Sequence, residues 1–204
     1  MLDVTSSLRH RLPVSMAMVR QLCGELQAAL GLQPRRVALG VHFVGETRMK
    51  ALVAQAQSHE LASAQPPPRS ARPTDILAFG NPMDVAADGL HKHPASSLEE
   101  MKKCNLAWKS AYGDPVRDIG ELFLCPAVIE RDCLKDQVTF EGRLPVLLAH
   151  GLCHLLGHDH DTMRTSAQMF QLEQQLLQAV SPHTGKLLQP LARYTNESDQ
   201  LAKH

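Results

Sequence analysis

The most constraining feature of the sequence is a run of histidines around a glycine. It reads His150-Gly-Leu-Cys-His154-Leu-Leu-Gly157-His158-Asp159-His160 and follows an apolar stretch, so we predict a helix over residues 144–156. Residues four apart on a helix lie on one face, one turn apart, so the His150 and His154 imidazoles can reach one ion. Gly157 can adopt a positive φ and end the helix, which lets the chain return His160 to the same point.

Three neutral imidazoles leave a fourth position open for water, which is typical of a catalytic zinc. A lone histidine on an apolar helix is more often a core residue than a ligand. A pair at i and i+4, a helix-ending glycine and a third histidine at the right offset are hard to explain by packing. We therefore predict one zinc ion per chain, bound by His150, His154 and His160.

The neighbours of these histidines are assigned other roles. His158 is predicted to face solvent or to support a ligand, because Gly157 turns the chain before it. Asp159 is predicted to accept a hydrogen bond from a ligand imidazole rather than to bind metal. Cys153 could bind zinc through its thiolate, but its apolar surroundings favour burial as a small hydrophobic residue.

The spacing H-x3-H-x2-G-x2-H matches that of the metzincin metalloproteases. Those proteases carry a glutamate directly after the first histidine as the general base. Gly151 stands at that position here, so a peptidase mechanism lacks its proton acceptor.

Strand and helix patterns alternate along a chain of 204 residues, which is enough for one hydrophobic core. No linker divides it, so we predict a single α+β domain in which a small mixed sheet packs against helices. The predicted helices cover residues 14–30, 47–57, 98–111, 144–156 and 162–180, and the predicted strands cover 36–44, 75–79 and 121–129. Pro126 marks an edge or a bulge in the last strand.

Two segments lack this regularity. The proline-rich stretch at 64–75 is predicted to be a rigid extended loop, because prolines forbid helix and central strand. Residues 80–118 form a long insertion-like loop, which usually marks a functional segment. We assign residues 1–193 to the domain and 194–204 to a polar tail.

Composition narrows the classes of function. Lysine plus arginine equals aspartate plus glutamate, 21 against 21, so no global basic field indicates a nucleic-acid binder, although a local groove is allowed. The five cysteines form no CxxC pair, which favours a reducing compartment and buried free thiols. No apolar run is long enough for a membrane span, and the N-terminus has no secretory signal region, so we expect neither membrane insertion nor secretion.

The histidine segment resembles the signature of the YbeY family, H-G-x-L-H-L-x-G-[aromatic]-D-H. His158 replaces the aromatic residue, and Cys153 replaces a leucine, as in eukaryotic members. Pro73-Thr-Asp-Ile-Leu-Ala-Phe79 is similar to the family's P-T-D-V-L-S-F, and Ile119-Gly-Glu-Leu-Phe-Leu124 is similar to its L-G-D-I-x-[IL]. Residues 168–171 and 184–191 look like those of organelle-associated eukaryotic members.

The resemblance implies a zinc-dependent, single-strand-specific endoribonuclease that acts in ribosomal RNA maturation and ribosome quality control. It implies single-stranded rRNA and the ribosomal small subunit as partners, and a mitochondrial or other organellar location, with the cytoplasm as the alternative. The family also has an arginine, thought to serve RNA, at the start of R-x-K-D-K-P-T-D. Pro68 stands in that place here, Arg69 follows it, and Arg72 replaces the lysine before the proline. Arg69 and Arg72 are therefore the expected RNA contacts, and solvated loop charges are the alternative.

Two other functions stay open at this stage. One is a ribosome-assembly factor with a structural metal and little nuclease activity. The neutral net charge favours docking to the ribosome over free RNA scanning in either case. The other is a metallohydrolase of small substrates. The sequence leaves the catalytic residues beyond the metal ligands unknown, and it does not choose between water and the ribose 2′-hydroxyl as nucleophile.

Overall fold

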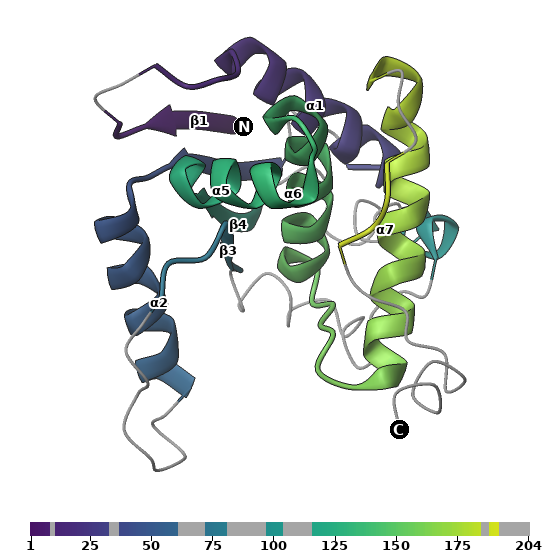
Figure 1. Ribbon diagram of the computed structural model, residues 1–204. Coiled ribbons are helices and arrows are strands. Elements are labelled where there is room, and N and C mark those ends of the chain that lie inside the picture. Colours follow the sequence, from purple (N-terminus) through teal and green to yellow (C-terminus); the bar gives the residue numbers. More distant parts are fainter. Residues whose placement is uncertain are drawn as a thin grey trace, which may run out of the picture.

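One mixed sheet organises the fold in the computed structural model (Figure 1), which describes residues 1–8, 11–32, 37–60, 72–80, 97–103, 116–184 and 188–191. Its strands are β1 (Leu2–Ser6), β2 (Val37–Phe43), β3 (Ile76–Phe79) and β4 (Arg117–Leu124). The helices are α1 (Met16–Ala29), α2 (Glu46–Glu60), α5 (Pro126–Asp136), α6 (Phe140–Leu155) and α7 (Met163–Thr184), and a short helix covers residues 98–103. This arrangement confirms the predicted α+β class.

The strand order in the sheet is β1-β2-β4-β3. β1, β2 and β4 run parallel, and β3 is an antiparallel edge strand paired with β4. Residues of β2 alternate between buried and half-buried, as the sequence pattern predicts for a strand with one face in the core. The antiparallel β3 brings the predicted Pro73–Phe79 segment to the edge beside α6.

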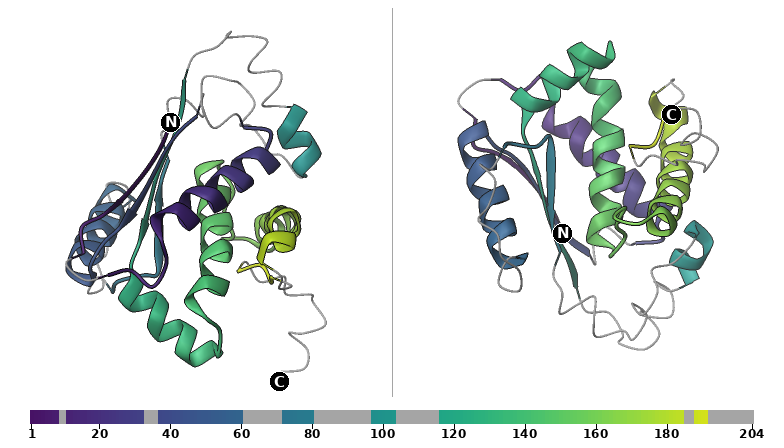
Figure 2. Two further views of the ribbon diagram at one scale, coloured as in Figure 1. Left: turned by 90° about the horizontal axis from the view of Figure 1, so that it is seen from above. Right: turned by 60° about the horizontal axis from the view of Figure 1, so that its bottom comes forward.

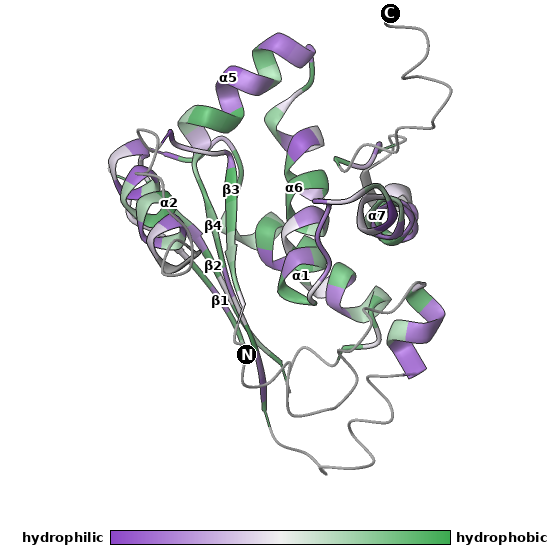
Figure 3. Cartoon of the chain, turned by 90° about the horizontal axis from the view of Figure 1, so that it is seen from below, coloured by the Kyte–Doolittle hydropathy of each residue, from purple (hydrophilic) through white to green (hydrophobic). Residues whose placement is uncertain are grey.

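Helices cover both faces of the sheet. Figure 2 shows α2 on one face and α1, α6 and α7 on the other, and Figure 3 shows the sheet on edge between α2 and α6. The main core fills the space between the sheet and the α1, α6 and α7 side, with Leu122, Leu148 and Leu176 fully buried. A smaller apolar cluster of Val44, Met49, Cys125 and Val128 lies where α2 and α5 meet the sheet.

The predicted helices are present with small shifts of their ends. Ser15 caps α1 by accepting a hydrogen bond from the Met18 N–H, and Gly31, with a positive φ, follows the end of the helix. Ser97 caps the short helix at 98–103, and residues 104–111 of that prediction lie outside the described residues. α6 begins at Phe140, four residues earlier than predicted, because Thr139 provides an N-cap and Pro145 is tolerated inside the helix.

The prediction of a strand over 121–129 is wrong in its second half. β4 ends at Leu124, and Pro126 occupies the first position of α5. Proline suits this position because the first helical turn needs no intrahelical N–H donor. Val128 and Ile129 are buried on the helix, which explains why the apolar run continues beyond the strand.

Strand β1 was not predicted. Val4 is buried and Leu2 is half-buried, so the first residues add an edge strand to the sheet beside β2. None of the helices among the described residues is both long enough and apolar enough to cross a membrane. Most of the 80–118 loop and the whole 194–204 tail lie outside the described residues, although β4 already begins at Arg117.

Candidate metal centre

The C-terminal end of α6 builds the site from a single stretch of chain. His150 and His154 lie in the last turns of the helix, and Leu156 is its C-cap. Gly157 has a φ of 86°, a value that glycine adopts without steric strain. The Gly157 N–H donates to the His154 carbonyl at 2.9 Å and the His158 N–H to the Cys153 carbonyl at 3.0 Å, which is the Schellman pattern of helix ends. This turn directs the chain back toward the helix, as the sequence predicts.

The three predicted ligand histidines lie together. The ligand atoms of His150, His154 and His160 all lie within 4.8 Å of one another. The ring centroids are 4.6 Å apart for His150 and His154, 5.1 Å for His154 and His160, and 5.4 Å for His150 and His160. Among the described residues, this is the group of histidine, cysteine and acidic side chains that could hold a metal ion.

Hydrogen bonds fix which nitrogen of two imidazoles faces the centre. Nδ1 of His154 lies 3.0 Å from the His158 carbonyl oxygen, which can only accept, so this nitrogen carries the proton. Nδ1 of His150 lies 2.7 Å from the Glu173 carboxylate. When both rings are neutral, Nε2 of each is left with a lone pair, and the two Nε2 atoms are 3.1 Å apart. Two lone pairs at this distance repel unless a cation lies between them.

The donor set fits zinc. A tetrahedral zinc with Zn–N bonds of about 2.0–2.1 Å holds its nitrogens roughly 3.3 Å apart, close to the 3.1 Å between the two Nε2 atoms. Burial and the neighbouring His150 lower the pKa of His154, which favours the neutral imidazole that binds metal. The residues present therefore fit a three-histidine metal site.

Exposure increases from one ligand to the next. His150 is buried, His154 is half-buried and His160 is exposed. The centre is thus anchored in the core on one side and open to solvent on the other. An ion held there is accessible to a large substrate.

Gly151 explains how the ligand helix approaches the sheet so closely. A Cβ at this position would lie 2.7 Å from Ile76 Cδ1 and 2.7 Å from Leu122 Cδ2, closer than real side chains come. The position after His150 therefore faces the packed contact between α6 and the sheet. A glutamate in this place, as metzincins have, would have to enter that contact.

The predicted neighbours of the ligands have mixed outcomes. His158 is buried and not solvent-facing, and its carbonyl supports His154, so the supporting role is the one that the structure favours. Asp159 is exposed, and hydrogen bonds from Thr165 and from the Asp161 backbone lower the pKa of its carboxyl; its pairing with a ligand imidazole stays a prediction. Cys153 is buried, as predicted, and burial raises its pKa well above the usual range. Arg72 is exposed just before β3, and Arg69 lies outside the described residues, so RNA contact by both stays a prediction.

Glu173 is the site residue that sequence reasoning missed. It comes from α7, thirteen residues after His160, and its side chain is fully buried against His150. A signal did exist. Glu173 occupies a core-facing position in the apolar stripe of α7, which consists of Met169, Leu172, Leu176, Leu177 and Val180. A lone acidic residue in such a stripe predicts a buried polar partner.

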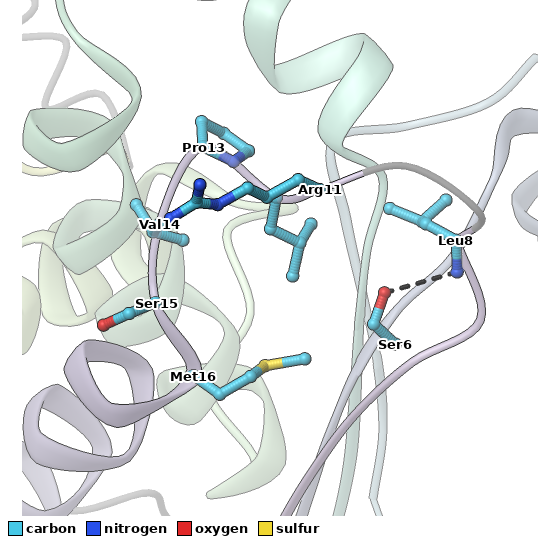
Figure 4. A pocket seen from close by; sticks show the side chains of 8 residues that line it. Ser6, Leu8, Arg11, Pro13, Val14, Ser15 and Met16 are labelled. Carbon is cyan, nitrogen blue, oxygen red and sulfur yellow. Dashed lines mark hydrogen bonds between the residues drawn. The ribbon is translucent and has the colours of Figure 1, made fainter.

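Two hollows in the surface are separate from the histidines. One of about 600 Å³ lies between the end of β1 and the start of α1, and Figure 4 shows Ser6, Leu8, Arg11 and Met16 along its wall. The other, of about 350 Å³, lies between the start of α6 and residues 188–191. Neither contains a predicted ligand or RNA contact.

The fold and site define an α+β protein with a three-histidine metal centre at the end of a helix. Comparison with known families gives a match to the family described as endoribonuclease YbeY over residues 14–181. The chain therefore belongs to the YbeY family, as the resemblance in its sequence implies.

Comparisons with individual relatives agree with this family assignment. The chain is 34% identical to an endoribonuclease YbeY of Cutibacterium acnes, over 54% of this chain and 58% of the relative. It is 41% identical to the human endoribonuclease YbeY, over 37% of this chain and 45% of the relative. The match thus spans little more than half of the bacterial relative and less than half of the human one.

A solved structure supports the fold alone. The solution structure of a Thermotoga maritima protein matches with a TM-score of 0.50 and 20% identity, over 91% of this chain and 92% of that one. Coverage of nearly the whole of both chains agrees with a single α+β domain.

Proposed function

We propose that this protein is a zinc-dependent endoribonuclease that cuts single-stranded RNA. The observation that carries the proposal is the set of three converging imidazoles, in two of which Nδ1 contacts a hydrogen-bond acceptor and Nε2 is left to face the centre. Zinc at such a site activates water or polarises a phosphoryl oxygen, which suits phosphodiester cleavage. Family membership supports RNA as the substrate, since the relatives are described as endoribonucleases.

The chain's own residues would prepare the site for this chemistry. The Glu173 carboxylate and the His158 carbonyl hold His150 and His154 in one orientation, so neither ring has to rotate when metal binds. The exposed His160 leaves the centre open to a polymer, which cannot enter a closed pocket. The packed Gly151 stands where a metzincin has its general-base glutamate, which argues against peptide hydrolysis.

The finer proposal is that one zinc ion per chain serves ribosomal RNA maturation and ribosome quality control, with the ribosomal small subunit as partner. This part rests on what the family is known for and on the neutral net charge, which favours docking to a particle over free scanning of RNA. We also propose a mitochondrial or other organellar location, because residues 168–171 and 184–191 resemble those of organelle-associated members. Subcellular fractionation of the tagged full-length protein tests the location, and a purely cytoplasmic signal would contradict it.

A cleavage assay tests the reaction. We expect purified protein to cut an end-labelled, unstructured RNA, to spare the same RNA in a duplex, and to leave casein intact. Chelation should stop the cleavage and zinc should restore it. His154→Ala is the matched control for a contaminating nuclease, because it removes a ligand of intermediate exposure from the surface turn of α6.

The outcomes separate the candidate functions. RNA cleavage by His154→Ala at the wild-type rate would contradict the proposed metal-dependent nuclease. Stoichiometric zinc with no RNA cleavage would favour the ribosome-assembly factor with a structural metal. Robust peptidase activity lost in His154→Ala would contradict both.

A further inference from the structure

The buried carboxylate of Glu173 joins two distant parts of the chain. Its Oε1 lies 2.7 Å from Nδ1 of His150, and its Oε2 accepts the backbone N–H of Leu191 at 2.7 Å. The carboxylate itself is fully buried. One side chain on α7 therefore contacts both a metal-ligand imidazole and the segment that follows α7.

A carboxylate in this position needs both donors. Burying a charged group is strongly unfavourable unless it is paired and hydrogen-bonded. A carboxylate accepts hydrogen bonds at both oxygens, and a backbone N–H can only donate. With Leu191 donating to Oε2 and His150 donating to Oε1, each oxygen has one donor, and the proton of His150 stays on Nδ1.

The segment that supplies the second donor is itself held in place. Leu188 and Leu191 are half-buried and pack against the main core. Residues 188–191 also line a hollow together with Thr139, Gly142 and Val146 from the start of α6. The Leu191 N–H is thereby presented to Glu173 by packing that does not involve the metal centre.

We propose that Glu173 is the positioning residue of the metal centre and that residues 188–191 hold it in place. Through this pair of hydrogen bonds, the segment after α7 sets the orientation of His150. The segment thus contributes to metal affinity although none of its residues binds the ion. This inference rests on the metal site of the proposed function and not on the reaction catalysed there.

Zinc affinity of the full chain, measured by competition with a chromophoric chelator, tests the first contact. Glu173→Gln keeps the shape of the side chain but places an NH2 group against one of the two donors. We expect a 10–100-fold loss of zinc affinity, the usual effect of removing the hydrogen-bond partner of a ligand histidine. Val180→Ala, seven residues further along the buried face of α7, is the control for general loss of stability. It should lower the unfolding temperature of the metal-free protein and leave zinc affinity unchanged.

A backbone change tests the second contact. Leu191→Pro removes the N–H that donates to Glu173, whereas Leu191→Ala removes more apolar side chain but keeps that N–H. We expect Leu191→Pro to bind zinc at least about tenfold more weakly than Leu191→Ala. Equal affinities of the two variants would overturn the role of the segment.

The remaining outcomes are also decisive. Unchanged zinc affinity in Glu173→Gln, or an equal loss in Val180→Ala, would overturn the positioning role of Glu173. A wild-type protein that bound no zinc would contradict the proposed function itself. If wild-type protein binds zinc tightly and the variants bind it equally well, then only this inference fails, and the proposed function is not contradicted.

Discussion

At the scale of single residues, the chemistry depends on which imidazole nitrogen carries the proton. A carbonyl and a carboxylate occupy the Nδ1 sides of His154 and His150, so the lone pairs on Nε2 point at the centre. His160 completes the set from the turn after the helix. The site is therefore a property of hydrogen bonds around the ligands as much as of the ligands themselves.

Thiol reactivity gives a prediction for the cysteines. Cys23, Cys125, Cys133 and Cys153 are buried, and burial raises the pKa of Cys23 to about 12. The reactive form of a thiol is the thiolate, so these residues should not react with a disulfide reagent at pH 8 in the native protein. In a Cys104→Ser variant we expect no fast reaction until denaturant is added, after which the four remaining thiols react. Fast labelling of the native variant would contradict the burial.

The two arginines before β3 give a prediction for RNA binding. If Arg69 and Arg72 contact phosphates, the double variant Arg69→Ala/Arg72→Ala should bind single-stranded oligonucleotide more weakly. Each lost phosphate contact should also flatten the log–log salt dependence by about 0.7. Zinc content should stay unchanged. Titrations at several salt concentrations that gave the wild-type slope would show that these arginines are solvated surface charges.

The sequence predicted the convergence of the three histidines better than it predicted the groups that support them. His150, His154 and His160 lie within eleven residues, so helix geometry and one glycine suffice to bring them together. Glu173 reaches the site only because α7 packs on α6, a tertiary contact that no local spacing encodes. The burial of His158 is likewise not encoded by local spacing, because it depends on the turn after Gly157.

At the scale of elements, α6 connects the core to the metal centre. Its middle is buried against the sheet, and its last turn carries two ligands. Gly151 lets the helix come within contact distance of Ile76 on β3 and Leu122 on β4. The close packing of this helix fixes the depth at which His150 sits.

A pair of glycine variants tests this packing. Replacing a helical glycine by alanine gains about 1 kcal/mol of intrinsic helix stability, while overpacking a core costs about 1–3 kcal/mol. Gly151→Ala places a Cβ 2.7 Å from two core side chains, so we expect a lower unfolding temperature. A Cβ added at Gly24 on α1 would have nothing within 4 Å, so Gly24→Ala should raise the unfolding temperature. Equal effects of the two substitutions in thermal unfolding would contradict the close contact.

The ends of helices and strands show where the local sequence pattern was insufficient to predict the secondary structure. The apolar run at 121–129 reads as one strand, although Pro126 starts a helix whose buried face continues the run. β1 is short, and only pairing with β2 makes it a strand. Both errors occur where tertiary contacts decide between backbone conformations that the local sequence allows equally.

At the scale of the whole molecule, we expect metal binding and folding to be coupled. The ligands join α6 to the surface turn, and through Glu173 they are linked to α7 and residues 188–191. Anything that binds only the folded state stabilises it, by about 4 kcal/mol at a free concentration a thousand times Kd. We therefore expect zinc to raise the unfolding temperature of wild-type protein by roughly 10 °C. His154→Ala should show no such shift, and an equal shift in this variant would indicate binding elsewhere.

His150, His154 and His160 are placed to hold one metal ion together. Metal content per chain, measured by mass spectrometry after purification in zinc, tests it most directly. We expect one zinc per wild-type chain, a near-complete loss in each single alanine variant of the three histidines, and full content in His158→Ala. Zinc retained by His160→Ala and lost by His158→Ala would contradict it.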